Sequence, residues 1–352
     1  QNGRIGYSNR WMRTVKWKLE HEAGEALFNP FNPFDSDPSV AGVQTDGLAN
    51  TNVVWHGGKL LALEEGHAPF AVDPDTLESL GAWTFDGALE GPMTAHPKMD
   101  PKTGEMLFFG YMVDEPMGAG LSYQVVDADG RLTRSDRFQA PFASMMHDFI
   151  TTDEHVIFPV FPLTGSLERA MNGGPAFAWE PDKGTHIGVM PRNGSVEDIR
   201  WFETDPCYVF HPMNAYTEGN KIVAHVMQFE QAPLFPHLDG SAPDPEKANA
   251  RLCEWVIDLA DNSNSVKRTY LDDITGEFPR LDERFAGLGY RHGYYAASTS
   301  KDGGLGFDAV VHHDFEKGDK SLYALPNGDR TGEPVFVPAS ADAPEGKGYL
   351  LS

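Results

Sequence analysis

The chain has 352 residues, of which 40% are hydrophobic, so it can bury a large core as one all-β domain or as two smaller domains. Its 52 acidic and 28 basic side chains give a net charge of −24, and no cluster of Lys and Arg interrupts this negative field. Such a charge repels polyanions, which argues against nucleic acid as a partner and makes anionic lipid surfaces poor ones.

Cys207 and Cys253 are the only cysteines, so the chain has no disulfide framework. We therefore expect a reducing compartment, the cytoplasm, although the two thiols could pair in an oxidising one. No apolar run is long enough to span a membrane, and the N-terminus lacks the apolar core of a signal peptide. Peripheral membrane contact stays open, as does the oligomeric state. Because the chain lacks an initial Met and ends on an apparent strand, we expect a segment of a longer protein.

In chain order, the first predicted element is a helical segment at about 12–28, where Glu and Ala occur at a density that favours helix. Polar turns then alternate with short runs of Val, Ile, Phe, Leu and Tyr, which is the pattern of hairpins. The turns read WHGGKL, VDPDTLE, MDPKTGE, VDADGRL, TTDEH, TEGNK, KDGGLG and LPNGDR. So many hairpins favour a β-propeller over a sandwich or barrel, and we expect a single all-β domain over residues 1–352.

Three histidines share one position relative to these turns. His96, His147 and His211 each lie a few residues before a turn that leads into an apolar strand. Their separations are somewhat larger than the roughly 40–50 residues of a propeller blade, so each could occupy an equivalent place in a successive blade. The innermost strands of a propeller surround one axis, where three histidines would make a metal site. Spacing alone leaves that interpretation and three unrelated turn residues equally open.

The words around these histidines, TAHPKMDPKTGEM, MMHDFITTD and FHPMNAY, resemble three of the four iron-ligand motifs of the carotenoid cleavage oxygenases. This family includes lignostilbene dioxygenases and apocarotenoid oxygenases. The resemblance continues through ANTNVVWHGGKLLALEEG, VDPDTLESLG, GEFPRLDERF and GEPVFVPA, and it covers nearly the whole chain in the family's order. It implies a seven-bladed β-propeller with a cap of loops and helices, which we place at about 162–180.

The resemblance also implies a ferrous ion, Fe(II), on the axis, held by four imidazoles. His96, His147 and His211 match three of these ligands. The family's glutamates that accept hydrogen bonds from the outer N–H groups of the ligands match Glu65, Glu277 and Glu333. Such carboxylates fix the imidazole tautomer and compensate the charge of the ion. For any one of these glutamates alone, an ordinary surface carboxylate is the competing interpretation.

The chain departs from the family at its ends. The fourth ligand follows a strand that KGYLLS resembles, and no histidine of this chain can be assigned to it. The family's first blade also precedes the point where this chain begins. We therefore expect an incomplete propeller with weaker iron binding, and a non-catalytic propeller stays an alternative to an enzyme. A calcium-dependent propeller hydrolase would need oxygen ligands on the axis, and the histidine motifs argue against it.

A second departure concerns the substrate. Stilbene-cleaving members pair a lysine and a tyrosine with the phenol of the substrate, whereas Glu64 and Phe31 stand near those positions here. Because a carboxylate repels a phenolate, we expect a dioxygenase that uses dioxygen to cleave a conjugated double bond of an apolar, apocarotenoid-like polyene into two carbonyl products. A lignostilbene-type stilbene is the alternative. Candidate tunnel residues, whose competing role is plain core packing, are Phe31, Glu64, Met146, Phe149, Phe161 and Phe210.

Overall fold

A computed structural model describes residues 6–29, 35–299 and 306–352. Its first helix, α1 (Val15–Ala23), lies within the segment expected to be helical. The hydroxyl of Thr14 accepts the N–H of Trp17 at the start of α1, and Gly24 ends the helix at a φ of 74°. The only other α-helix among the described residues is the short α2 (Leu167–Met171). Within the same ranges, no helix has the length and apolar character needed to cross a membrane.

Most of the remaining regular structure is antiparallel sheet. The first sheet contains β1 (Asn52–His56), β2 (Lys59–Leu63), β3 (Phe70–Val72) and β4 (Ser79–Ala82). The second contains β5 (Lys98–Met99), β6 (Met106–Tyr111), β7 (Gly120–Val126) and β8 (Leu132–Gln139). The third contains β9 (Ile150–Thr151), β10 (His155–Val160), β13 (Thr185–Pro191) and β14 (Arg200–Thr204). Each is a blade whose strands pair in chain order, and in the third blade a separate segment is inserted between β10 and β13.

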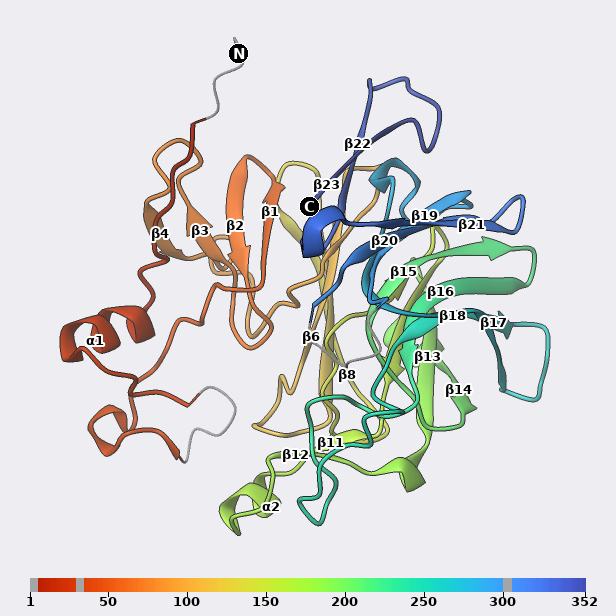
Figure 1. Ribbon diagram of the computed structural model, residues 1–352. Coiled ribbons are helices and arrows are strands. Elements are labelled where there is room, and N and C mark those ends of the chain that lie inside the picture. The colour runs from red at the N-terminus through yellow and green to blue at the C-terminus, as the bar shows by residue number, and fades with distance from the viewer. Residues whose placement is uncertain (1–5, 30–34, 300–305) are drawn as a thin grey trace.

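The next seven strands form one continuous sheet that comprises two blades. They are β15 (Tyr208–Glu218), β16 (Lys221–Phe229), β17 (Arg251–Asp258), β18 (Val266–Leu281), β19 (His292–Ala297), β20 (Ala309–Asp314) and β21 (Asp319–Ala324). The 16-residue strand β18 pairs with β17 through its first part and with β19 through its last part. The described residues thus form five four-stranded blades and a separate hairpin of β22 (Val335–Pro338) and β23 (Gly348–Leu351), arranged around a common centre (Figure 1).

Smaller elements connect the blades. Within the expected cap segment, β11 (Leu163–Gly165) pairs with β12 (Phe177–Trp179), and α2 lies between them. Figure 1 shows this segment beyond the ends of the blades. Single 3-10 turns occupy Pro38–Val40, Pro181–Lys183, Val196–Asp198, Glu283–Phe285 and Pro326–Gly328.

The position of a strand within its blade explains its pattern of apolar and polar residues. In the second blade, every residue of β7, which has a neighbouring strand on each side, is buried, whereas burial alternates along the outer strand β8, whose sequence LTRSDRFQ alternates in the same way. An antiparallel strand with one face toward solvent shows this alternation. Aromatic side chains from neighbouring blades, such as Phe109 and Phe149, form the core between the blades.

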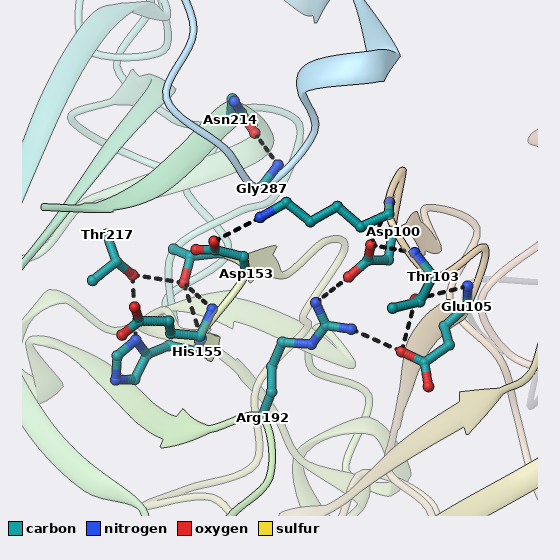
Figure 2. Close-up of polar contacts among 12 residues, drawn as sticks. Asp100, Thr103, Glu105, Asp153, His155, Arg192, Asn214, Thr217 and Gly287 are labelled. Atoms are coloured by element: carbon teal, nitrogen blue, oxygen red, sulfur yellow. Dashed lines mark hydrogen bonds and ion pairs between the residues drawn. The ribbon is translucent and has the colours of Figure 1, made fainter.

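The innermost strands line a cavity of about 320 Å³ on the axis. Its walls come from β1, β5, β9, β15 and the end of β18. The turns that follow β5, β9 and β15 lie at the ends of these strands opposite to His96, His147 and His211. Polar contacts join these turns to each other and to nearby residues, and we call them the turn network (Figure 2). Its members are Asp100, Lys102, Glu105, Thr152, Asp153, Arg192, Asn214, Thr217 and Gly287.

In the turn network, Arg192 donates to Asp100 and, at 3.1 Å, to Glu105, which lie in the turn of the second blade. Lys102 of the same turn pairs with Asp153 of the third blade at 3.1 Å. These ion pairs connect the second and third blades, and both partners of each pair lie within the described residues (Figure 2).

The turn network continues around the axis through uncharged groups. The hydroxyls of Thr152 and Thr217 lie 2.8 Å apart and connect the third and fourth blades. The side-chain oxygen of Asn214 accepts the N–H of Gly287 at 2.8 Å and ties the fourth blade to the loop after β18 (Figure 2). The inner strands β5, β9 and β15, which carry or closely follow the three histidines, are therefore held together at their far ends.

Candidate metal centre

The three histidines predicted to be ligands lie together on the axis. His96 precedes β5, His147 precedes β9, and His211 lies in β15 where the register with β16 shifts at a β-bulge. Such an irregularity re-aims a side chain that a regular strand would direct elsewhere. The Nε2 atom of His147 lies 2.9 Å from Nε2 of His96 and 3.2 Å from Nε2 of His211. The candidate ligand atoms of the three residues all lie within 4.8 Å of one another.

This arrangement fits a divalent metal ion. Two imidazole nitrogens bound at right angles, with metal–nitrogen bonds of about 2.1 Å, would lie about 3.0 Å apart. The two measured Nε2 separations lie close to that value. Three nitrogen lone pairs directed at one point repel each other unless a cation or a proton lies between them. Imidazole nitrogens suit iron and other transition metals, and three of them leave coordination positions free.

Glu65 holds the outer nitrogen of His147. It follows β2 of the first blade, and its Oε2 lies 2.7 Å from Nδ1 of His147. Its other oxygen accepts the hydroxyl of Tyr111 at 2.9 Å. A proton on Nδ1 donated to this carboxylate leaves the lone pair of Nε2 free for a metal.

Glu277 bonds to the outer nitrogen of His211 in the same way, with its Oε2 at 2.6 Å from Nδ1. It lies at a register shift in β18, and the next residue, Phe278, has a φ of 56°, which is unusual for a residue other than glycine. Its second oxygen, Oε1, is buried without a hydrogen-bond partner among the described residues. Burial acts to lower the pKa of His211, but the Glu277 carboxylate outweighs it and raises that pKa.

His96 lies in the same cluster without a carboxylate of its own. Across the described ranges, no Asp or Glu bonds to its Nδ1 atom. Burial, and then the two neighbouring imidazoles, lower the pKa of His96 far below its usual value. The ring therefore stays neutral, which is the form that binds metal.

Among the described residues, the partner of Glu333 is Arg280, and a role for Glu333 in supporting an imidazole stays a prediction. It lines the axial cavity with His96 and His211, but its carboxylate pairs with Arg280 at 3.1 Å. Within the described residues, no hydrogen bond joins it to one of the three histidines. Two of the outer nitrogens are already taken by Glu65 and Glu277, and the guanidinium of Arg280 neutralises the third carboxylate.

The predicted tunnel residues separate into three groups. Phe31 lies outside the described residues. Met146, Phe149 and Phe161 are almost fully buried in the core between blades, although Phe149 also reaches the wall of the axial cavity. Phe210 lies beside the metal centre, with its ring 5.3 Å from that of His147 in an edge-to-face arrangement. A tunnel role for these residues stays a prediction.

Glu64 has a hydrogen-bond partner, His67, that the sequence did not indicate. Its Oε1 lies 2.6 Å from Nδ1 of His67, whose Nε2 in turn lies 2.9 Å from the hydroxyl of Thr45. Burial acts to raise the pKa of Glu64, but the bonds from His67 and Gly66 lower it, so the carboxylate stays ionised. The same carboxylate raises the pKa of His67. The charge of Glu64 is therefore compensated locally.

Several polar residues of the site were not predicted from the sequence. They are Tyr111, which bonds to Glu65, Arg280, which pairs with Glu333, and the ion pair of Lys98 with Asp148. Lys98 and Asp148 lie within two residues of His96 and His147 in the sequence, but only the packing of two blades shows that they form an ion pair. Cys207 and Cys253, which could have formed a disulfide, are both buried free thiols.

Comparisons with known proteins agree with this geometry. The sequence model of the family described as retinal pigment epithelial membrane protein matches residues 1–352. An isoeugenol monooxygenase of Pseudomonas putida is 39% identical, and the match covers all of this chain and 76% of that protein. A lignostilbene-alpha,beta-dioxygenase of Sphingomonas paucimobilis is 36% identical over all of this chain and 75% of its own length.

Solved structures give the same result. The lignostilbene dioxygenase of Pseudomonas brassicacearum has a TM-score of 0.91 and 37% identity, covering 97% of this chain and 74% of its own. A cobalt-substituted Synechocystis apocarotenoid oxygenase has a TM-score of 0.83 and 26% identity, covering 96% of this chain and 73% of its own. Seven-bladed propellers are the fold of these relatives, which confirms the predicted fold class. The chain belongs to the carotenoid cleavage oxygenase family.

Proposed function

We propose that the chain binds Fe(II) through His96, His147 and His211 and cleaves a conjugated carbon–carbon double bond with dioxygen, giving two carbonyl products. The observation that carries this proposal is the convergence of three Nε2 atoms, with Nδ1 of His147 and of His211 each held by a carboxylate. Bound iron would supply the position at which dioxygen is activated. Membership of a family of iron-dependent oxygenases supports the same assignment.

The chain's own residues then have simple tasks. Glu65 and Glu277 keep the protons of His147 and His211 on Nδ1, so that both rings present a lone pair to the ion. Their two negative charges offset the +2 charge of the ion. Phe210 covers one side of His147 with an apolar ring, which limits access of water at that side. No residue needs to act as a general acid or base, because the two carbonyl products together contain the alkene and both oxygen atoms.

For the substrate we favour an apolar, apocarotenoid-like polyene. Glu64 is an ionised carboxylate already bonded to His67, so it offers no cation to a phenolate. A phenolate brought near it would meet a like charge that the imidazole only partly offsets.

An arylalkene is the second candidate, and the names of the relatives favour it. Two of them are an isoeugenol monooxygenase and a lignostilbene dioxygenase, at 39% and 36% identity. A phenylpropenoid or stilbene offers the same conjugated double bond in a shorter molecule. The cytoplasm is our proposed compartment, because both cysteines are free thiols.

The test is an assay of the full-length protein purified anaerobically and loaded with Fe(II). An apocarotenal, isoeugenol and a hydroxystilbene are offered separately, and oxygen uptake and aldehyde formation are measured together. We expect one substrate class to give aldehydes that carry oxygen from labelled dioxygen. If the iron-loaded protein consumes no oxygen with any of the three substrates, this result would contradict the proposed enzymatic function and favour the non-catalytic propeller.

A further inference from the structure

The three ligand histidines are not supported in the same way. His147 and His211 each have a carboxylate on Nδ1, at 2.7 and 2.6 Å. His96 has none among the described residues, and it lies in the short segment before β5 and not inside a strand. Something else must hold its segment in place, because a ligand displaced by about 1 Å loses most of its contribution to a preorganised site.

Thr94, two residues before His96, provides one tie. Its hydroxyl oxygen accepts the N–H of His96 at 3.1 Å, and the same hydroxyl donates to the carbonyl of His147 at 3.3 Å. The Thr94 N–H donates to the carbonyl of Phe109 on β6 at 2.8 Å, which fixes the residue to its own blade. Thr94 is only 1% exposed, so water does not compete for these bonds.

Lys98, two residues after His96, provides the second tie. Its ammonium lies 2.7 Å from the carboxylate of Asp148, the residue that follows His147. Asp148 is buried and also accepts the N–H of Phe149 at 2.7 Å, so it is fixed to the third blade. The Lys98 ammonium also lies 5.6 Å from the centre of the Phe149 ring. The pair borders the axial cavity that reaches His96 and His211.

We infer that Thr94 and Lys98 are positioning residues, which clamp the segment of His96 onto the segment of His147 and so replace the carboxylate that His96 lacks. The two ties lie on either side of His96, and both end at His147 or its neighbour. With both in place, the backbone of His96 can move only together with that of His147, which keeps the two Nε2 atoms at their separation of 2.9 Å. The inference rests on the proposed metal site and adds the residues that hold its geometry.

The test compares variants of the full-length protein loaded with Co(II) alone. Thr94→Val keeps the shape of the side chain and removes the hydroxyl, and Lys98→Met removes the charge. Thr94→Ser and Lys98→Arg keep the donors and serve as rescues. The control is Lys102→Met, which breaks the ion pair with Asp153 between the same two blades at 3.1 Å, where the lysine side chain is 59% exposed.

Two readouts are measured: the dissociation constant of Co(II) by competition with a chelator, and the visible absorption spectrum of bound Co(II). We expect Thr94→Val and Lys98→Met each to weaken binding by about tenfold and to shift the spectrum, as loss of an outer partner of a ligand does. Thr94→Ser, Lys98→Arg and Lys102→Met should match the wild type. Thermal unfolding of the metal-free proteins identifies any variant that is not folded at the assay temperature.

Three results would overturn the inference in distinguishable ways. Unchanged affinity and spectrum in Thr94→Val and Lys98→Met, with a wild type that binds metal, would remove the positioning role and leave the proposed function intact. A wild type that binds neither Co(II) nor Fe(II) would overturn the proposed function and the inference with it. An equal loss in Lys102→Met would show that blade cohesion, and not the clamp, governs binding.

Discussion

The two ends of the same inner strands differ in how their polar groups are paired. In the turn network, Lys102 pairs with Asp153 and Arg192 pairs with Asp100, so each charge has its partner within the chain. At the histidine end, three Nε2 lone pairs face one another, and the nearest carboxylates bond to the opposite side of the rings. At the turn end these charges are paired within the chain, whereas at the histidine end the three residues could hold a metal ion. Removing a residue at one end should therefore affect stability, and at the other end metal binding.

His147→Ala should have the largest effect on metal binding. His147 lies between the other two ligands, within 2.9 and 3.2 Å of their Nε2 atoms, so its loss leaves two ligands and an unpaired Glu65. We expect no iron above background by elemental analysis and no oxygen-dependent cleavage. His155→Ala, in the turn at the other end of the same blade, is the control and should keep its iron. Normal iron content in His147→Ala would remove this residue from the site.

Glu277→Gln should weaken Fe(II) binding by about 10-fold to 100-fold, because an amide accepts the proton of an imidazole less well than a carboxylate does. Chelator competition under anaerobic conditions measures the change. The control is Glu254→Gln, which changes a carboxylate 3.5 Å from the imidazole of His225, outside the metal centre. Equal affinities in the wild type and in Glu277→Gln would mean that this carboxylate does not support the ligand.

Arg192→Met should leave metal affinity unchanged and lower the free energy of unfolding by about 2–4 kcal/mol. Arg192 and Asp100 are largely buried, with side chains 14% and 6% exposed, so the variant leaves an unpaired carboxylate in the turn network. Urea unfolding of the metal-free protein measures this loss. A large drop in Co(II) affinity with little loss of stability would reverse the comparison between the two ends.

The smallest effect should be the pH dependence of the difference in unfolding free energy between the wild type and Arg192→Met. Burial acts to raise the pKa of Asp100, but Arg192 and the N–H groups of Thr103 and Lys102 hold it below 3.8, its unfolded value. A lowered pKa stabilises the fold fully above the unfolded value and ceases to do so as pH falls through the folded value. The stability difference between wild type and Arg192→Met should thus be full at about pH 5 and shrink below about pH 3.8. A difference that grows on acidification would contradict the assignment to Asp100.

Much of the fold and of the site could be predicted because short-range signals carry it. Turn sequences between apolar runs indicated the hairpins, and the structure places β5–β6, β9–β10 and β15–β16 at the three turns that follow the histidines. The adjacent His312 and His313 point to opposite faces of β20. One bonds to His292 and the other to Asp272, as alternation in β20 requires.

The hydrogen-bond and ion-pair partners of the predicted residues could not be predicted from the sequence, because contacts between blades join residues far apart in the chain. Glu65 and His147 are 82 residues apart, and nothing in the sequence between them encodes their hydrogen bond. Glu333 has the same chemistry as Glu277, yet it pairs with Arg280. The sequence indicated Glu64 as a candidate substrate-tunnel residue but gave no sign of its bond to His67.

The sequence by itself therefore determined the all-β class and the hairpins, because turn chemistry acts over a few residues. The resemblance of three short motifs to the family's ligand motifs identified the three candidate metal ligands. Only the tertiary structure decided that the three Nε2 atoms meet, which carboxylates hold them, and that Thr94 and Lys98 connect two ligand segments. The physical reason is the packing of blades around one axis, which sets distances between strands that the local sequence of each strand does not contain.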